Sequence, residues 1–138
     1  MKFSTELPPN CPPSSCVPAS GKVFRIVEND PPKRDDFRSM RELNPNKPYT
    51  NECMACGLSV YRDKSDVYKM IRRIPGFQKR VQKRVQKRMH MIASGTLNET
   101  LGVIVHTPNG NEDSHHTWWM YFECSAWEVF AVIEPIQL

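Results

Sequence analysis

The last third of the chain carries three runs rich in β-branched and aromatic residues, and these runs restrict the fold most. They are "GVIVHT" (102–107), "HTWWMYF" (116–122) and "WEVFAVIE" (127–134), separated by the turn-rich "PNGNEDSH" and the short "ECSA". Trp118, Met120 and Phe122 fall on one face of the middle run, and Trp119 and Tyr121 fall on the other. The pattern predicts a three-stranded antiparallel meander whose middle strand is at least partly covered on both faces.

The preceding residues predict two more strands and several helices. Strands are expected at "GKVFRIVEN" (21–29) and "GLSVY" (57–61), and a short helix at "DDFRSMREL" (35–43), begun by an Asp cap. A second helix through "DVYKMIRRI" should be capped by Asp63 or Ser65 and interrupted at Pro75 and Gly76. We therefore expect an α+β fold with central helices, one of them strongly basic, packed on a mostly antiparallel sheet.

The first 20 residues differ in composition from the remainder. They hold five of the twelve prolines, so residues 1–20 are expected to form an extended Pro-rich arm and residues 21–138 a single globular α+β domain. No apolar run approaches the roughly 20 residues needed to span a bilayer, and "MKFSTELPPN" has no apolar core of a secretory signal. The expected location is therefore the cytoplasm.

The stretch "QKRVQKRVQKRM" (78–89) is almost a tetrapeptide repeated three times. Phe77, Val81, Val85 and Met89 recur every fourth residue and Ile92 extends the line, which predicts one helix docked through an apolar stripe. Between residues 69 and 88 the chain has nine basic residues and no acid, whereas the remainder has ten basic and fifteen acidic residues. One positive element on an acidic body indicates a directed electrostatic surface.

Like charges repeat at i,i+4 along this helix, and each such pair costs about 0.2–0.5 kcal/mol unless an anion offsets it. Nucleic-acid phosphates, an acidic protein surface or the chain's own acids would do so, and a solvated helix face is the alternative. The leading hypothesis is a nucleic-acid or polyanion-binding module without sequence specificity, and a further alternative is an interaction subunit for an acidic protein. The candidate anion-binding residues are Arg72, Arg73, Lys79, Arg80, Lys83, Arg84, Lys87 and Arg88.

Five cysteines in an expected reducing compartment favour free thiols or metal ligands over disulfides. "CPPSSC" supplies Cys11 and Cys16, and "CMACG" supplies Cys53 and Cys56 before a glycine. Four thiolates from these pairs would complete a structural zinc site, whereas unpaired thiols are the alternative.

"HTPNGNEDSHHTWW" gathers His106, His115 and His116 with Glu112 and Asp113 around a glycine-bearing loop. Such residues perform general acid and base chemistry, and the alternative is a polar hairpin loop. Adjacent histidines on a strand point in opposite directions, so one of His115 and His116 should face a given site. The enzyme hypothesis is therefore a small toxin-like nuclease or transferase.

Arg25, Ser59 and the late acids Glu128 and Glu134 occur in an order that resembles the arginine-serine-glutamate ADP-ribosyltransferases. The resemblance implies an arginine that holds the phosphates of NAD and a glutamate that orients its ribose. The chain has one serine in "GLSVY" where that family has a serine-threonine-serine triplet, and it lacks the glutamate-x-glutamate pair. "CGLSVY" together with "SHHTWW" is similar to small uncharacterised bacterial proteins, which implies a bacterial or phage source.

Overall fold

A seven-stranded antiparallel sheet organises the chain in a computed structural model, which describes residues 2–83 and 90–137, with the backbone alone for residues 80–83. The strand order is β1-β5-β6-β3-β2-β4-β7. The strands are β1 (Val17–Pro18), β2 (Gly21–Val27), β3 (Leu58–Tyr61), β4 (Met91–Leu97), β5 (Gly102–His106), β6 (His115–Met120) and β7 (Phe130–Pro135). The expected α+β class with a mostly antiparallel sheet is confirmed.

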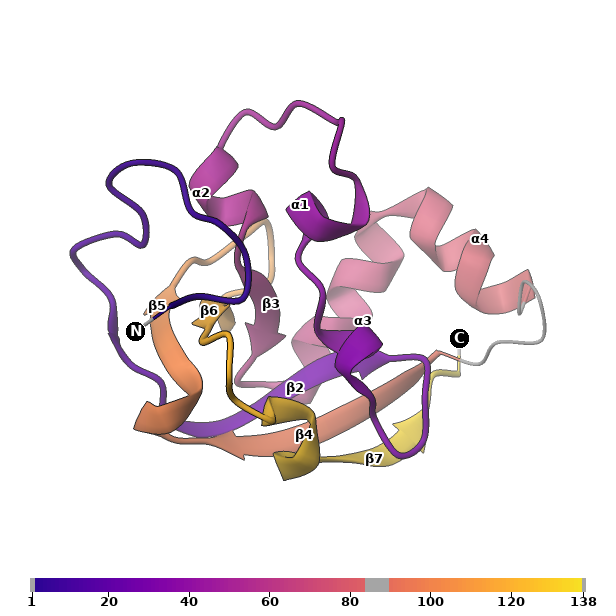
Figure 1. Ribbon diagram of the computed structural model, residues 1–138. Coiled ribbons are helices and arrows are strands. Elements are labelled where there is room, and N and C mark those ends of the chain that lie inside the picture. Colours follow the sequence, from indigo (N-terminus) through magenta and orange to yellow (C-terminus); the bar gives the residue numbers. More distant parts are fainter. Residues whose placement is uncertain (1, 84–89, 138) are drawn as a thin grey trace.

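Short helices occupy the connections between the strands. The α-helices are α1 (Met40–Leu43), α2 (Glu52–Ala55), α3 (Lys64–Arg73) and α4 (Pro75–Lys83), and the 3₁₀ helices are η1 (Arg34–Phe37), η3 (Glu99–Leu101) and η4 (Ala126–Val129). In the view of Figure 1 the α-helices lie above β2, β4 and β7. Asp63 caps α3 as predicted, because its carboxylate accepts a hydrogen bond from the Ser65 amide at 2.9 Å.

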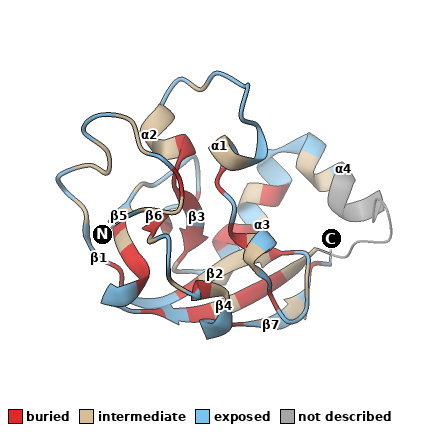
Figure 2. Cartoon of the chain, viewed as in Figure 1, coloured by how far each residue is buried: buried red, intermediate tan, exposed pale blue. Residues whose placement is uncertain are grey.

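Each face of the sheet carries its own apolar cluster. One face holds Val23, Val27, Val60 and Trp118, which pack with Phe37 of η1. The cluster on the other face includes residues of α3 and consists of Tyr61, Val67, Ile71, Ile92 and Ile136. Figure 2 shows buried residues concentrated along the strands and exposed ones along the loops. Both faces of β6 are therefore covered, as the alternation of its aromatic residues predicts.

The N-terminal arm is held to the body of the molecule at both ends. Near its start, the Ser4 amide donates to the Met120 carbonyl at 2.8 Å, and Thr5 Oγ1 donates to Glu42 Oε1 of α1 at 2.7 Å. Near its end, β1 pairs with β5. Between these ends a disulfide joins Cys11 to Cys53 of α2.

Three expectations about local structure are corrected. The apolar line from Phe77 to Ile92 does not form one helix, because Phe77 lies in α4 whereas Ile92 lies in β4. Val85 and Met89 of this line fall outside the described residues. β7 pairs with β4 and not with β6, so the meander contains β5 and β6 alone. The segment 35–43 is divided between η1 and α1, and the cap of α1 is Ser39.

The sequence of β4 explains why it was not recognised as a strand. "MIASGTL" has few β-branched residues, yet it pairs with β2 over seven positions. A side chain at Gly95 would meet the ring of Phe130 on β7 at 2.8 Å, so the small residue admits that ring. Packing against neighbouring strands thus overrides a weak intrinsic preference for strand.

Candidate functional site

The strands β3 and β6 bring together an exposed serine and a buried histidine. Ser59 Oγ lies 3.0 Å from His115 Nε2, Ser59 is exposed, and His115 is 7 % exposed. The register places Tyr61 opposite His115 and Ser59 opposite Thr117, so all four side chains share one face of the sheet. The two candidates proposed from the sequence are therefore in hydrogen-bond contact.

The other ring nitrogen of His115 fixes its tautomer. His115 Nδ1 lies 2.7 Å from the main-chain oxygen of Thr107, which can only accept a hydrogen bond. Nδ1 therefore carries the proton, and in the neutral ring Nε2 accepts the hydrogen bond that the Ser59 hydroxyl donates. Burial lowers the pKa of His115 below its usual value, which favours this neutral, proton-accepting form.

Hydroxyl groups extend the contact into a network that joins β3, β6 and the residue directly after β5. Thr107 Oγ1 lies 2.9 Å from His115 Nδ1 and 2.8 Å from Thr117 Oγ1. Tyr61 packs edge-on against the imidazole, with ring centroids 5.2 Å apart. The network fixes the imidazole plane as a catalytic base requires, and neither Thr107 nor Thr117 was a candidate from the sequence, because nothing in their spacing predicts these contacts.

The loop before His115 is attached to α3 at two points. The Ser114 amide donates to Asp66 Oδ2 at 2.9 Å near the start of α3, and Asp66 is buried. Near the end of α3, Arg73 forms a two-pronged ion pair with the fully buried carboxylate of Glu112, with Nη2 2.7 Å from Oε1. These two contacts fix the loop that leads into β6 and His115 against α3.

Arg25 supports the strand that carries Ser59. Its Nη1 donates to the Ser59 main-chain oxygen at 2.7 Å, its Nε donates to the Asp36 main-chain oxygen at 3.1 Å, and its guanidinium lies over the ring of Phe37. Desolvation lowers the pKa of Arg25 to about 10, so the group stays charged at neutral pH. Arg25 therefore acts on Ser59 through the main chain, as a positioning residue.

The other two candidate histidines lie on the opposite face of the sheet from His115. His106 and His116 form a cross-strand pair with ring centroids 4.9 Å apart. His106 Nε2 lies against the Asp113 main-chain oxygen, and His116 Nδ1 lies 2.8 Å from that of Ser114. The prediction that His115 and His116 face opposite sides is confirmed, and His115 alone joins Ser59.

The structure describes some of the candidate anion-binding residues. Arg72 lies at the end of α3 with its guanidinium over the Tyr68 ring, whereas Arg73 is engaged with Glu112. Lys79 is exposed on α4. Arg80 and Lys83 belong to α4 by their backbone, and Arg84, Lys87 and Arg88 lie outside the described residues.

The late acids occupy other parts of the fold. Glu134 on β7 accepts a hydrogen bond from Tyr68 and pairs with Lys64 at 2.6 Å, and β2 and β4 separate its strand from β3. Glu128 is exposed on η4. Neither acid therefore joins Arg25 and Ser59.

The cysteines differ from the expected thiolate cluster. Cys11 and Cys53 are bonded to each other, while Cys16, Cys56 and Cys124 are free thiols. Two sulfurs of the expected zinc set are thus consumed in a disulfide and present no thiolate to a metal. Among residues 2–83 and 90–137, no group of three or more His, Cys, Asp or Glu side chains is arranged to hold a metal ion.

Comparison of the chain with protein-family models, with curated proteins and with solved structures gives no match in any of the three. Within the part of the chain that the structure describes, no helix has the length and apolar character needed to cross a membrane. The chemistry of the site is therefore argued from its own geometry.

Proposed function

We propose that the protein is a small nucleic-acid-cleaving enzyme in which Ser59 is the nucleophile and His115 is the general base. The observation that supports this most is the contact between the exposed Ser59 hydroxyl and His115 Nε2 at 3.0 Å, with Nδ1 held by the Thr107 carbonyl. A nucleophile, an adjacent base and a third group that orients the base are the components of an activated serine.

The reaction begins when Ser59 Oγ attacks the phosphorus of a phosphodiester and its proton passes to His115 Nε2. The bond between phosphorus and the leaving oxygen then breaks, and His115 returns the proton to that oxygen. The product is a nucleic-acid strand attached to Ser59 through phosphate. Water, deprotonated by His115, attacks the phosphorus and releases the serine hydroxyl, so the enzyme is restored.

The charge distribution favours a polyanionic substrate. Nine basic residues and no acid lie between residues 69 and 88, and the ion-paired end of α3 connects this segment to the loop that leads into β6. Phosphate contacts from such a segment bind without base preference and release counterions. The net negative remainder of the chain would repel a polyanion elsewhere, which directs it towards the basic segment.

The proposal is tested with 5′-labelled RNA and single-stranded DNA of mixed sequence. The wild-type protein should cleave at least one of them, and Ser59→Ala and His115→Asn should each lower the rate at least about a hundredfold. Lys79→Ala is the matched control, because it should weaken binding and reduce the salt slope while cleavage at saturating substrate continues. Full activity of Ser59→Ala, or no cleavage of either polymer by the wild-type protein, would overturn the proposal.

The contact between Arg25 and Ser59 favours a second candidate, an NAD-dependent transferase. Arg25 Nη1 donates to the Ser59 main-chain oxygen at 2.7 Å, so two of the residues that carry the resemblance lie close together on the adjacent strands β2 and β3. Incubation with labelled NAD and an extract of acceptor proteins tests this candidate. Label transfer that is lost in Arg25→Lys, without polymer cleavage, would favour the transferase over the nuclease.

A further inference from the structure

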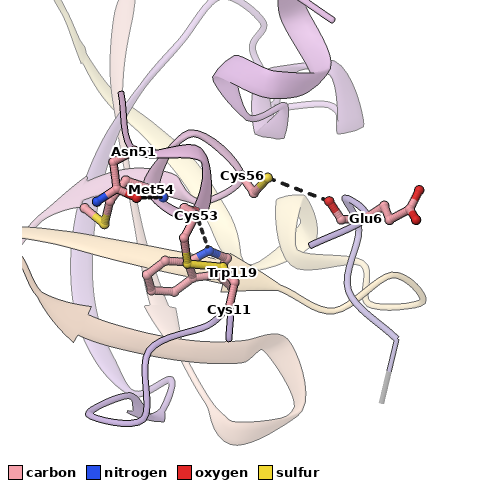
Figure 3. Close-up of a disulfide and its surroundings, with 7 residues drawn as sticks. All are labelled: Glu6, Cys11, Asn51, Cys53, Met54, Cys56 and Trp119. Atoms are coloured by element: carbon pink, nitrogen blue, oxygen red, sulfur yellow. Dashed lines mark hydrogen bonds between the residues drawn. A yellow bond between two sulfur atoms is a disulfide. The ribbon is translucent and has the colours of Figure 1, made fainter. Parts of the chain in front are cut away.

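The N-terminal arm forms a strap across α2 that is fixed at three places. Residues 2–5 bind β6 and α1, and Val17–Pro18 pairs with β5. Between these anchors, the disulfide from Cys11 to Cys53 and the contact of the Cys56 thiol with the Glu6 main-chain oxygen at 3.7 Å join the strap to α2. Figure 3 shows the two contacts, one at Cys53 in α2 and one at Cys56, the residue that follows the helix.

A free thiol lies one helical turn from the disulfide. The Cys56 amide donates to the Cys53 main-chain oxygen at 3.2 Å, so a single turn of the chain closes between the two cysteines. Residues three apart on a helical turn have Cβ atoms about 5–6 Å apart, whereas a disulfide requires about 3.5–4.5 Å. The turn must therefore tighten, and the Cys56 side chain, which points towards Glu6 in Figure 3, must rotate for its sulfur to reach Cys53. Cys53 therefore has two potential partners, Cys11 on the strap and Cys56 on its own turn.

We propose that the strap is released by an internal thiol-disulfide exchange in which Cys56 replaces Cys11 as the partner of Cys53. Cys56 gives its proton to solvent, and its sulfur attacks Cys53 Sγ. The Cys53–Cys56 bond forms as the Cys11–Cys53 bond breaks, and the electron pair leaves on Cys11 Sγ, which takes up a proton. One disulfide is present before and after, so no external oxidant or reductant is consumed.

The exchange removes both contacts that join the middle of the strap to Cys53 and Cys56. The covalent link to Cys11 is lost, and Cys56 no longer has a hydrogen to donate to the Glu6 carbonyl. Residues 6–16 would then be held only at their flanks, and four prolines at positions 8, 9, 12 and 13 disfavour any regular structure that could hold them otherwise. A segment with so few remaining bonds should open readily.

The resting state should resist exchange at neutral pH. Cys56 is 6 % exposed, and burial raises the pKa of its thiol, with the Arg41 guanidinium opposing this effect and the carboxylates of Glu52 and Glu42 adding to it. Because the thiolate is the attacking species, the exchange rate should rise about tenfold for each pH unit below that pKa. Alkaline conditions or a basic catalyst would therefore release the strap.

To test the exchange, the protein is incubated with N-ethylmaleimide and without reductant at about pH 7, 8 and 9, a range that brackets the pKa of an ordinary thiol. The products are mapped by mass spectrometry of unreduced digests. The expected product carries the label on Cys11 and a Cys53–Cys56 disulfide. It should also form in Cys16→Ser/Cys124→Ser, which lacks the other two free thiols. In Cys56→Ser, Cys11 should remain unlabelled.

Amide hydrogen exchange over residues 6–16 gives the second measurement. It should accelerate roughly tenfold or more in the labelled product, while β6 stays protected. Equal labelling of Cys11 in the wild-type protein and in Cys56→Ser would overturn the proposal, as would a Cys11–Cys16 product with label on Cys53. Absence of any labelled Cys11 at the highest pH would overturn it as well.

Discussion

His115 and His116 are neighbours in the chain, yet the two faces of β6 give them different surroundings. His115 packs against Tyr61 and contacts Ser59, whereas His116 pairs with His106 of β5 on the opposite face. Both imidazoles have one nitrogen against a main-chain oxygen, so both tautomers are set in the same way. Of these two histidines, His115 has a serine hydroxyl at its other nitrogen. Side-chain alternation along one strand, and not residue type, thus decides which histidine contacts Ser59.

The strongest prediction tests whether His115 and His116 differ in function. His115→Asn should lower nucleic-acid cleavage about a hundredfold to ten-thousandfold, because it removes the base that accepts the Ser59 proton. His116→Asn should change the rate less than about threefold, because His116 lies on the face of β6 opposite to Ser59. Initial rates at saturating substrate, with circular dichroism as a check of folding, measure both variants. Equal losses in the two would show that the faces of β6 do not differ in function.

The sequence predicted the face of each histidine but not its partners. Alternation of Trp118 and Trp119 along β6 is a local property, so it was readable from the order of residues. The contacts of Ser59 with His115 and of Glu112 with Arg73 join positions 56 and 39 residues apart, and they depend on strand order and on the docking of α3. Single-sequence reasoning has no access to such long-range pairings.

The disulfide and β4 were missed for related reasons. The arm that carries Cys11, the partner of Cys53, is anchored to β6 and, through β1, to β5, and cysteine spacing carries no information about those anchors. The sequence of β4 is weak in strand-forming residues, and its position is set by pairing with β2 on one side and β7 on the other. The basic repeat was recognised, although its residues 84–89 lie outside the described part of the chain.

The next effect concerns the ion pair that positions the His115 face. Arg73→Ala should lower the free energy of unfolding by about 3 kcal/mol, because the Glu112 carboxylate is 0 % exposed and would be left without its partner. Glu112→Gln should cost less, about 1–2 kcal/mol, since the Arg73 side chain is 39 % exposed and water can solvate it. Urea denaturation at constant slope measures both changes. A larger loss for Glu112→Gln would contradict this asymmetry.

The pH dependence of stability also distinguishes His115 from His116. Burial lowers the pKa of both His115 and His116 in the folded protein below the value of 6.5, so the neutral forms favour folding. Their contribution is present above pH 6.5 and is lost as the pH falls from that value through the lowered pKa. Hydrogen bonds to Thr107 and Ser114 and the charges of Glu112, Arg73 and Arg62 modify the shifts.

This dependence is measured from the midpoints of urea denaturation of the wild type and the two asparagine variants. The midpoints are compared at about pH 7 and pH 5, on either side of the pKa of an ordinary histidine. The wild type should lose stability between these pH values, and His115→Asn should lose less of it. His116→Asn should also flatten the dependence, but by a smaller amount because His116 is less buried than His115. A wild-type protein that becomes more stable at the lower pH would contradict the assignment of neutral imidazoles on both faces.

The last substitution, with the smallest effect, tests whether the hydroxyl network around His115 has a role separate from that of His115 itself. Thr117→Val removes the hydroxyl that lies 2.8 Å from Thr107 Oγ1 and keeps the volume of a buried side chain, so it should lower stability by about 1 kcal/mol. Thr107 Oγ1 and the Thr107 main-chain oxygen still face His115 Nδ1 in this variant, so the tautomer should be kept and the cleavage rate should fall less than about threefold. Denaturation and rate measurements on one preparation test both statements. A hundredfold loss of rate without a loss of stability would instead place Thr117 in the catalytic machinery, and the distinction between the base and its surrounding hydroxyls would no longer hold.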